Sequence, residues 1–209
     1  MKAFIVTASP RYRALVRQAA STGLRQGELF GLEDGDPAET VTVKQQLIGP
    51  DKGVPYLGEP KTRQSYRSVP QGRSVVDEIE RHREKFPPQA VYIEDRTNPR
   101  KPAWRHARLL YTSETGGAIR RGSWAKVWAQ NVKRANAHLK NSGREVRVPE
   151  DTTLHDLRHF YASVLIKYGA TPKQVQMRPG HAKPSITLNV VYTHRSLPLS
   201  GGHADTGSA

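Results

Sequence analysis

The segment between Thr153 and Gly169 constrains the fold more than any other part of the chain. Its apolar residues recur at i, i+3, i+4, i+7, i+8 and i+11, and they are Leu157, Phe160, Tyr161, Val164, Leu165 and Tyr168. This spacing places them along one stripe of an α-helix, and such a stripe is normally buried against a core. Thr153 stands three residues before Asp156 and predicts a capping-box start, whereas Gly169 predicts the stop.

The opposite face of this predicted helix carries His155, Arg158 and His159, which fall within about 100° of one another at helical spacing. Arginine offers a fork of donors that matches phosphate oxygens, and histidine exchanges protons near neutral pH. We therefore expect an outward cationic face that suits a phosphate, with an ordinary solvated face as the alternative. A zinc pair of His155 and His159 is disfavoured, because no Glu follows the first histidine and no third ligand is apparent.

Composition limits the class of protein. The chain has 209 residues, a length that suits one domain with a substantial core. It has no cysteine, which excludes disulfides and thiolate metal sites and is typical of a reducing compartment. No apolar run approaches the roughly 18 residues of a membrane span, and the N-terminus lacks a signal-peptide pattern. We expect a soluble, cytoplasmic protein with no membrane partner.

The charge balance indicates a polyanionic partner. Lysine and arginine number 33 against 19 acidic residues, so the formal net charge is +14. Nucleic acid is favoured over an anionic membrane, because no long amphipathic basic helix is evident. Charge alone would equally suit a ribosome-associated protein or a passive DNA-binding module, so any chemistry has to come from the motifs.

The remaining pattern predicts further helices and a small sheet. Helices are expected over residues 10–22, 73–85 and 123–139, with a short piece after Arg25 that Gly31 closes and another from Pro172 to Val175. Candidate strands at 40–47, 54–57 and 65–69 predict a three-stranded antiparallel sheet. Lys61 would lie at a hairpin tip between 58 and 64, where a solvated turn lysine is the default expectation. Residues 89–122 are expected to be loops with one or two brief elements.

Two further features have both a structural and a functional explanation. Arg25 follows a glycine break at the mouth of a new turn, from which a side chain can reach a cleft; a surface charge or a partner of Glu28 is the more common role. Trp124 and Trp128 lie on the apolar side of their helix, and core packing is favoured over base stacking.

Five pieces of the chain together resemble the catalytic domain of tyrosine recombinases, the phage integrase family. They are Thr-Gly-Leu-Arg-Gln-Gly-Glu around Arg25, Pro-Lys-Thr-Arg-Gln-Ser-Tyr-Arg-Ser-Val-Pro around Lys61, His-Asp-Leu-Arg-His from His155, Pro-Gly-His181 and Val-Tyr192-Thr-His. Each is weak alone, but five in this order over roughly residues 10–195 form a strong signal. The similarity is greatest to integrases of actinobacterial phages and mobile elements. It implies an α+β, mainly α-helical fold over residues 1–195 with a small three-stranded antiparallel sheet, and residues 196–209 read as a disordered tail.

The resemblance also implies an activity: site-specific DNA recombination and integration through a 3′-phosphotyrosyl intermediate, with no metal or other cofactor. Tyr192 would be the nucleophile, and Arg25 and Arg158 would clamp the scissile phosphate. His181 would add a donor, His155 would accept the tyrosine proton, and Lys61 would protonate the leaving 5′-oxygen. The expected partners are double-stranded DNA and, in a full-length relative, further copies of the chain that form a tetramer on DNA.

The chemistry of the reaction needs these residue types. A phosphodiester transition state gathers negative charge on its equatorial oxygens, so a site without a metal needs fixed cations and donors there. Two arginines supply them. A tyrosine with a pKa near 10 is almost wholly protonated at pH 7, and it needs a base or strongly cationic surroundings before it attacks.

The chain departs from the family pattern near its C-terminus. Pro179 stands where the family usually has an apolar residue, and its ring removes an amide donor beside His181. The eleven positions from His181 to Tyr192 (192 − 181) are one more than the family pattern, with Val190-Val191 as the apparent duplication. We also expect that the N-terminal DNA-clamping domain is absent. These departures keep two alternatives open: an impaired, truncated remnant that only binds DNA, and a nicking-closing enzyme like a type IB topoisomerase.

Overall fold

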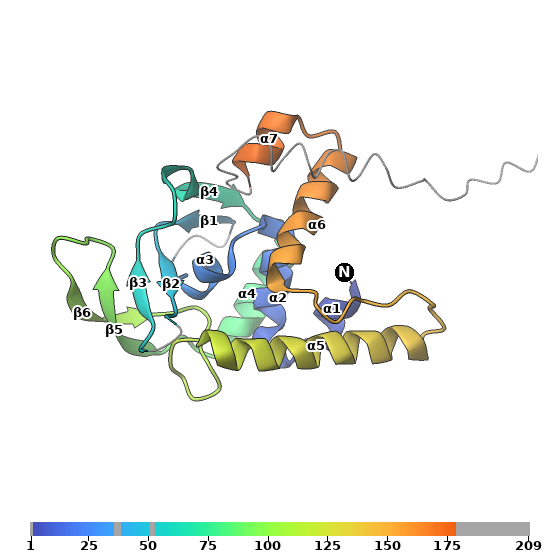
Figure 1. Cartoon of the computed structure of the whole chain (residues 1–209), viewed down its shortest axis with the longest axis horizontal. Helices are drawn as coiled ribbons and strands as arrows, with labels where there is room; N and C mark the ends of the chain where they lie inside the picture. Colours follow the sequence, from blue (N-terminus) through green and yellow to red (C-terminus); the bar gives the residue numbers. More distant parts are fainter. Residues whose placement is uncertain (1, 36–38, 51–52, 179–209) are drawn as a thin grey trace, which may run out of the picture.

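A computed structural model describes residues 2–35, 39–50 and 53–178 (Figure 1). His181, Tyr192 and the predicted tail lie outside the described residues. The described part is an α+β fold that is mainly helical, which confirms the predicted fold class. Its helices are α1 (Lys2–Thr7), α2 (Pro10–Thr22), α3 (Gln26–Phe30), α4 (Arg73–Lys85), α5 (Arg121–Asn141), α6 (Leu154–Lys167) and α7 (Pro172–Met177), with one 3-10 turn at Arg63–Ser65. Its strands are β1 (Thr40–Val43), β2 (Gln46–Ile48), β3 (Tyr56–Gly58), β4 (Arg67–Pro70), β5 (Ala90–Arg96) and β6 (Ala103–Arg108).

Local sequence signals set the ends of several helices. Pro10 occupies the first turn of α2, where its missing N–H costs nothing, and Gly23 ends the helix in the left-handed conformation at φ 63°. In α6 the predicted capping box is present, because Thr153 donates from its backbone N–H and its hydroxyl to Asp156 Oδ2 at 2.7 and 2.8 Å. The bounds of α2 and α4 agree with the prediction to the residue, and α5 extends two residues beyond it at each end.

The strands pair differently from the predicted three-stranded sheet. β1 pairs with β4 in an antiparallel ribbon of two strands, and β2, β3, β5 and β6 form a second, four-stranded sheet. Within that sheet β3 and β5 run parallel, so it is mixed. The expected single strand 40–47 divides because Gln45 turns inward and donates its Nε2 to the carbonyl of Gly31 at 2.8 Å. The connection that carries Lys61 therefore joins two different sheets and is not a hairpin.

The pattern also missed the β5–β6 hairpin within residues 89–122. Its register pairs Tyr92 with His106 and Ile93 with Arg105. Alternation is hard to see here, because Asp95 and Arg105 lie on the inner face as an ion pair of 2.6 Å rather than as apolar residues. The hairpin projects from the end of the molecule farthest from α6 (Figure 1).

Aromatic side chains from distant segments build the core between α1, α2 and α5. Trp128 stacks on Phe4 with a centroid distance of 5.3 Å, and Trp124 meets Tyr12 and Phe30 edge-on. Both tryptophans are buried, which confirms the predicted core role. Because Trp128 Nε1 donates to the carbonyl of Thr152 at 2.7 Å, the loop that leads into α6 is tied to α5.

The buried face of α6 differs from the predicted stripe. The buried residues are Leu154, Leu157, Arg158, Tyr161, Ala162 and Leu165, which is the same spacing begun three residues earlier. A shift of three residues rotates the buried face by about 60°. Consequently Phe160 is 39% exposed and Tyr168 is 82% exposed, whereas Arg158, predicted to face outward, is only 2% exposed. The helix turns this way because it packs against α2, where Arg158 finds a backbone acceptor.

Candidate functional site

The turn between α2 and α3 is the platform of the site. Gly23 lies at φ 63°, and a Cβ there would stand 2.6 Å from Cδ1 of Tyr161 on α6. Its carbonyl accepts a 2.8 Å hydrogen bond from Nη1 of Arg158, 135 residues away in sequence. A larger residue would meet both strain and a ring at this position. The glycine therefore lets α6 dock directly beside Arg25, the N-cap residue of α3.

Arg25 is fixed by a carboxylate and a hydroxyl. Its Nη1 donates to Oε1 of Glu28 at 2.7 Å and to Oγ of Ser65 at 2.9 Å, and its backbone N–H donates to Oε2 of Glu28 at 2.9 Å. The expected pairing with Glu28 is thus confirmed. The side chain of Arg25 is nevertheless 21% exposed, so it lies at the edge of the surface rather than within the core.

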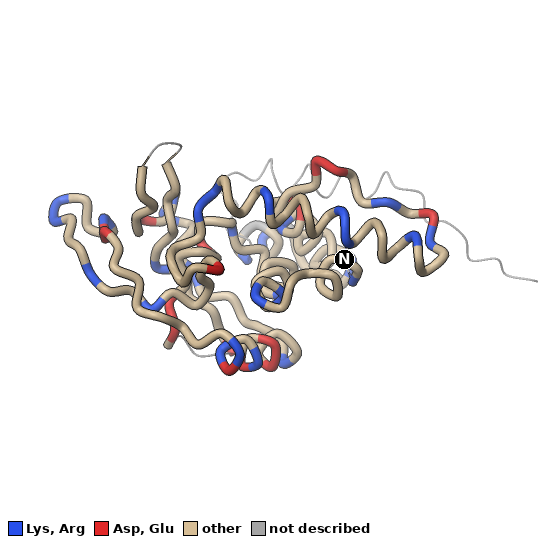
Figure 2. Tube along the Cα trace, turned by 90° about the horizontal axis from the view of Figure 1, so that it is seen from below, with Lys and Arg blue, Asp and Glu red and all other residues tan. Residues whose placement is uncertain are grey.

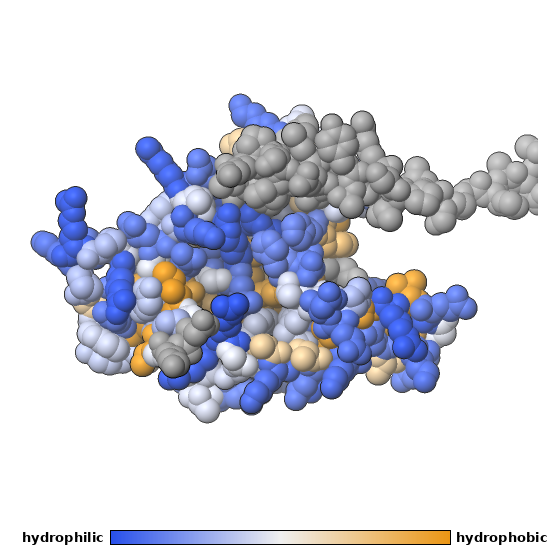
Figure 3. Space-filling model, viewed as in Figure 1, coloured by the Kyte–Doolittle hydropathy of each residue, from blue (hydrophilic) through white to orange (hydrophobic). Residues whose placement is uncertain are grey.

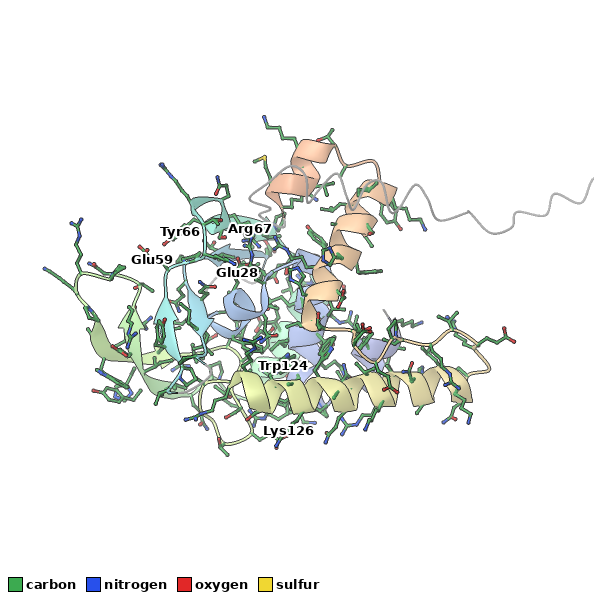
Figure 4. The ribbon with its side chains drawn as sticks, viewed as in Figure 1. Glu28, Glu59, Tyr66, Arg67, Trp124 and Lys126 are labelled. Atoms are coloured by element: carbon green, nitrogen blue, oxygen red, sulfur yellow. The ribbon has the colours of Figure 1, made fainter. Side chains whose placement is uncertain are left out.

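Arg67 completes this network, and the sequence analysis did not single it out. Its Nη2 and Nη1 donate to the two carboxylate oxygens of Glu28 at 2.9 and 3.2 Å, and Figure 4 shows the two side chains together between α3 and β4. The only sequence signal was the position of Arg67 in the Ser-Tyr-Arg-Ser-Val-Pro run, two residues before the buried Val69 and on the same side of the strand.

The carboxylate at the centre of the network stays ionised. Burial alone would raise the pKa of Glu28, but hydrogen bonds and charge from Arg67, followed by the bonds from Arg25, outweigh that effect. The net pKa lies below its ordinary value. Glu28 therefore places a full negative charge at the floor of the site, and only 1% of its side chain is exposed.

Arg158 is a buried cation among other cations. Burial lowers the pKa of Arg158 to about 9, the charges of Arg25 and Arg67 add to the shift, and Glu28 opposes it. The guanidinium remains protonated at neutral pH. Because its solvation is poor and its neighbours include two further cations, an anion bound beside it would relieve both penalties.

His155 lies one turn from Arg158 on α6 and reaches solvent. Desolvation lowers the pKa of His155, and the charges of His159, Arg158 and Arg25 lower it further, whereas Asp156 opposes them. The His155 and His159 rings meet edge to face at a centroid distance of 4.9 Å. Among the residues that the structure describes, no group of three His, Asp or Glu side chains could hold a metal ion around this pair. A neutral His155 next to cations can accept a proton at neutral pH.

Lys61 is exposed on the connection between β3 and β4. The next residue, Thr62, places its hydroxyl 3.0 Å from that of Ser65, which in turn accepts a hydrogen bond from Arg25. The loop that carries Lys61 is thus anchored beside Arg25. The structure brings together Arg25, Arg158 and His155, and it ties the Lys61 loop to them. The convergence of His181 and Tyr192 on this group concerns residues outside the described ranges and stays a prediction.

Helix α5 is strongly cationic. α5 carries Arg121, Lys126, Lys133, Arg134 and Lys140 and has no acidic residue along its 21 positions (Figure 2). Lys126 points away from the body of the domain (Figure 4), and the face seen in Figure 3 is mainly hydrophilic. No helix in the described ranges is long and apolar enough to cross a membrane.

Comparison with known proteins assigns the family. Residues 1–197 match the model of the phage integrase family, and the chain belongs to this family. It is 30% identical over 200 residues to a tyrosine recombinase XerC-like protein of Caldanaerobacter subterraneus subsp. tengcongensis, which covers 88% of this chain and 46% of that protein. It is 27% identical over 184 residues to tyrosine recombinase XerD of Listeria monocytogenes, with 88% and 50% covered.

A solved structure shares the fold. The Tn1549 transposon integrase in complex with transposon right end DNA superposes with a TM-score of 0.70 at 25% sequence identity, over 86% of this chain and 53% of that one. The chain spans about half the length of the relatives that it matches.

Proposed function

We propose that this domain cleaves and rejoins double-stranded DNA in site-specific recombination, through a covalent bond between Tyr192 and a 3′-phosphate. Attack by the tyrosine oxygen on phosphorus forms the phosphotyrosyl bond and breaks the bond to the 5′-oxygen. His155 takes the proton of the tyrosine hydroxyl, and Lys61 gives a proton to the departing 5′-oxygen. Rejoining reverses these steps, so no energy source is needed.

The two arginines are the electrostatic part of the mechanism. Arg25 and Arg158 hold the non-bridging oxygens of the phosphate, and His181 adds a further donor. Their charge counts most as the negative charge of the transition state grows, because the donors are fixed before the reaction begins. The lowered pKa of His155 keeps its ring neutral and able to accept a proton at physiological pH.

One observation carries this proposal: Arg158 is buried and donates to Gly23, two residues before Arg25, across 135 positions of sequence. Burying a guanidinium beside two further arginines is costly. Packing alone does not explain why Arg158 is buried there, whereas binding of a phosphate does. Family membership supports the same conclusion.

A covalent-trapping experiment tests the reaction. Double-stranded DNA carrying a nick and randomised flanks is incubated with the protein, and covalent adducts are isolated under denaturing conditions. We expect an adduct with the wild type and none with Tyr192→Phe. Tyr168→Phe is the matched control, because Tyr168 is 82% exposed and lies outside the proposed machinery. Its adduct should match that of the wild type.

The same experiment separates the alternatives. A protein that binds this DNA without any adduct is the impaired remnant. Relaxation of arbitrary supercoiled plasmid would favour nicking and closing of the topoisomerase type, whereas recovery of one flanking sequence from the random pool would favour recombination. An adduct that persists in Tyr192→Phe means that another tyrosine is the nucleophile.

Assembly and cellular setting follow from the same proposal. Exchange of strands between two duplexes requires four active sites, so we expect a homotetramer on DNA. The protein would work in the bacterial cytoplasm, where the DNA lies. The predicted closeness to integrases of actinobacterial phages and mobile elements stays a prediction.

A further inference from the structure

Arg67 donates four hydrogen bonds close to the site, and the proposed function gives it no role. The side chain is 8% exposed. Besides its two bonds to Glu28, its Nη1 donates to the carbonyl of Ser65 at 3.0 Å, and its Nε donates to the carbonyl of Arg178 at 2.9 Å. The Arg178 bond spans 111 positions and ties β4 to the end of α7.

Its hydrogen bonds argue against direct contact with a phosphate. A guanidinium has five N–H donors. Four of those of Arg67 point at protein oxygens: two at Glu28, one at Ser65 and one at Arg178. A bidentate clamp on a ligand needs two donors on one side. Arg67 is therefore occupied with the protein itself.

Its partners connect it to three parts of the site. Glu28 holds both the backbone N–H and the guanidinium of Arg25. The hydroxyl of Ser65 accepts from Arg25, and the backbone of the same residue accepts from Arg67. Arg178 stands three residues before His181 in the sequence.

We infer that Arg67 is the positioning residue of this site: it fixes Arg25 through Glu28 and holds the end of α7, which leads to His181, against β4. This inference rests on the proposed function for its effect on catalysis and on geometry alone for its effect on Arg25. Lysine is no substitute here, because an ammonium is a point donor and does not reproduce the planar fork that spans a carboxylate and two carbonyls.

The test compares Arg67→Gln and Arg67→Lys with Arg63→Gln. Arg63 is an exposed arginine in the 3-10 turn just before β4, so its loss removes the same charge without touching the network. Three quantities are measured on each protein: single-turnover adduct formation at saturating DNA, the Kd for the same DNA over a range of salt, and hydrogen exchange of the Arg25 backbone amide without DNA.

We expect Arg67→Gln to slow adduct formation about 100-fold, as a small misplacement of catalytic groups does. The Kd and its salt dependence should change no more than in Arg63→Gln, because neither side chain would act as a phosphate ligand. The Arg25 amide should exchange roughly 5- to 10-fold faster in Arg67→Gln and at the wild-type rate in Arg63→Gln. For both adduct formation and amide exchange, Arg67→Lys should give values between those of Arg67→Gln and Arg63→Gln. If Arg67→Gln does not fold, Arg67→Lys is used in its place.

Failure of this inference and failure of the proposed function give different results. If the wild type forms no Tyr192-dependent adduct, the proposed function is wrong, and faster exchange at Arg25 still supports the positioning role. Unchanged exchange at Arg25 in both Arg67 variants would overturn the inference. So would a salt slope reduced by about one in Arg67→Gln alone, since that marks a direct phosphate contact.

Discussion

Two arginine–carboxylate networks of this domain share their chemistry and differ in their surroundings. Around Glu28 the carboxylate is 1% exposed and its partner Arg67 is 8% exposed. Around Glu33, at the base of the β5–β6 hairpin, the carboxylate is 31% exposed and its partner Arg105 is 35% exposed. Arg105 also bonds Asp95 of β5, so the second network pins the hairpin to the rest of the domain.

The difference in burial indicates which network stabilises the fold and which one fixes charge at the site. The Glu33 network, whose side chains are about one-third exposed, ties segments together at little desolvation cost, although each exposed ion pair is worth only about 0–1 kcal/mol. Burying an ion pair gains little over apolar residues of the same volume. The Glu28 network lies beside Arg25 and Arg158, so fixed charge at the site explains its burial better than stability does.

The substitution with the largest expected effect removes the carboxylate of the buried network. Glu28→Ala leaves Arg25 and Arg67 buried or half-buried without their carboxylate, and we expect the free energy of unfolding to fall by about 3–5 kcal/mol. Glu33→Ala, the matched change in the exposed network, should cost about 1 kcal/mol. Urea denaturation of both variants measures the difference. Equal losses would mean that burial does not separate the two networks.

The next effect concerns catalysis. Arg158→Ala should slow adduct formation by a factor that corresponds to about 2.7–4 kcal/mol, the usual loss for one well-aimed donor. Arg105→Ala removes the same charge from the other network and should leave the rate within about threefold of the wild type, because it acts far from the phosphate. Rates are compared at saturating DNA. A similar loss in both variants would point to net charge rather than to a site.

A glycine substitution tests how α6 docks on the site. Gly23→Ala introduces strain at φ 63° and a Cβ 2.6 Å from Tyr161, and we expect a loss of about 1–3 kcal/mol in stability. Gly143 has φ 68° with no atom within 4 Å, so Gly143→Ala carries the strain without the clash. The excess loss in Gly23→Ala, measured by thermal unfolding, isolates the contact between α6 and the turn. No excess would contradict close docking.

The smallest expected effect is a shift in the pKa of His155, which reports the positive charges near it. Because desolvation and neighbouring cations lower the pKa of His155, its NMR titration midpoint should lie below the ordinary value of about 6.5. His159→Gln removes one of those cations and should raise the midpoint, although not fully, since desolvation is the larger cause. Because the pKa of His155 is lower in the folded state, the unfolded state binds a proton at a higher pH than the folded state does. This histidine therefore removes stability below about pH 6.5. A wild-type midpoint at or above 6.5 would contradict the expected lowering of the His155 pKa.

Much of the helical part could be predicted, because its signals are local. Pro10, Gly23, Thr153 and Asp156 act on their own turn of the chain, and the ends of α2 and the cap of α6 agree with prediction. The sheet pairing could not be obtained in this way. The pairing depends on contacts such as that of Gln45 with Gly31. Such contacts join segments whose own sequences do not indicate which partner they have.

The nearness of three of the proposed site residues could be predicted from the motifs, but the way in which they are held could not. The motifs predicted Arg25, Arg158 and His155, and the structure places these three residues near one another, whereas their catalytic roles are proposals. The burial of Arg158 was missed, because a charged residue is expected to face solvent until its acceptor, the Gly23 carbonyl, is known. Arg67 was missed because its partners come from α3 and the end of α7.

The bond between Arg158 and Gly23 also has a consequence in time. The ribosome releases the chain from its N-terminus at roughly 5–20 residues per second. When Gly23 and Arg25 have emerged, Arg158 is still more than a hundred codons away. The contact that places Arg158 beside the turn before Arg25 therefore cannot form until more than a hundred further residues have been synthesised, so the two halves of this contact meet late, after the turn itself has left the ribosome.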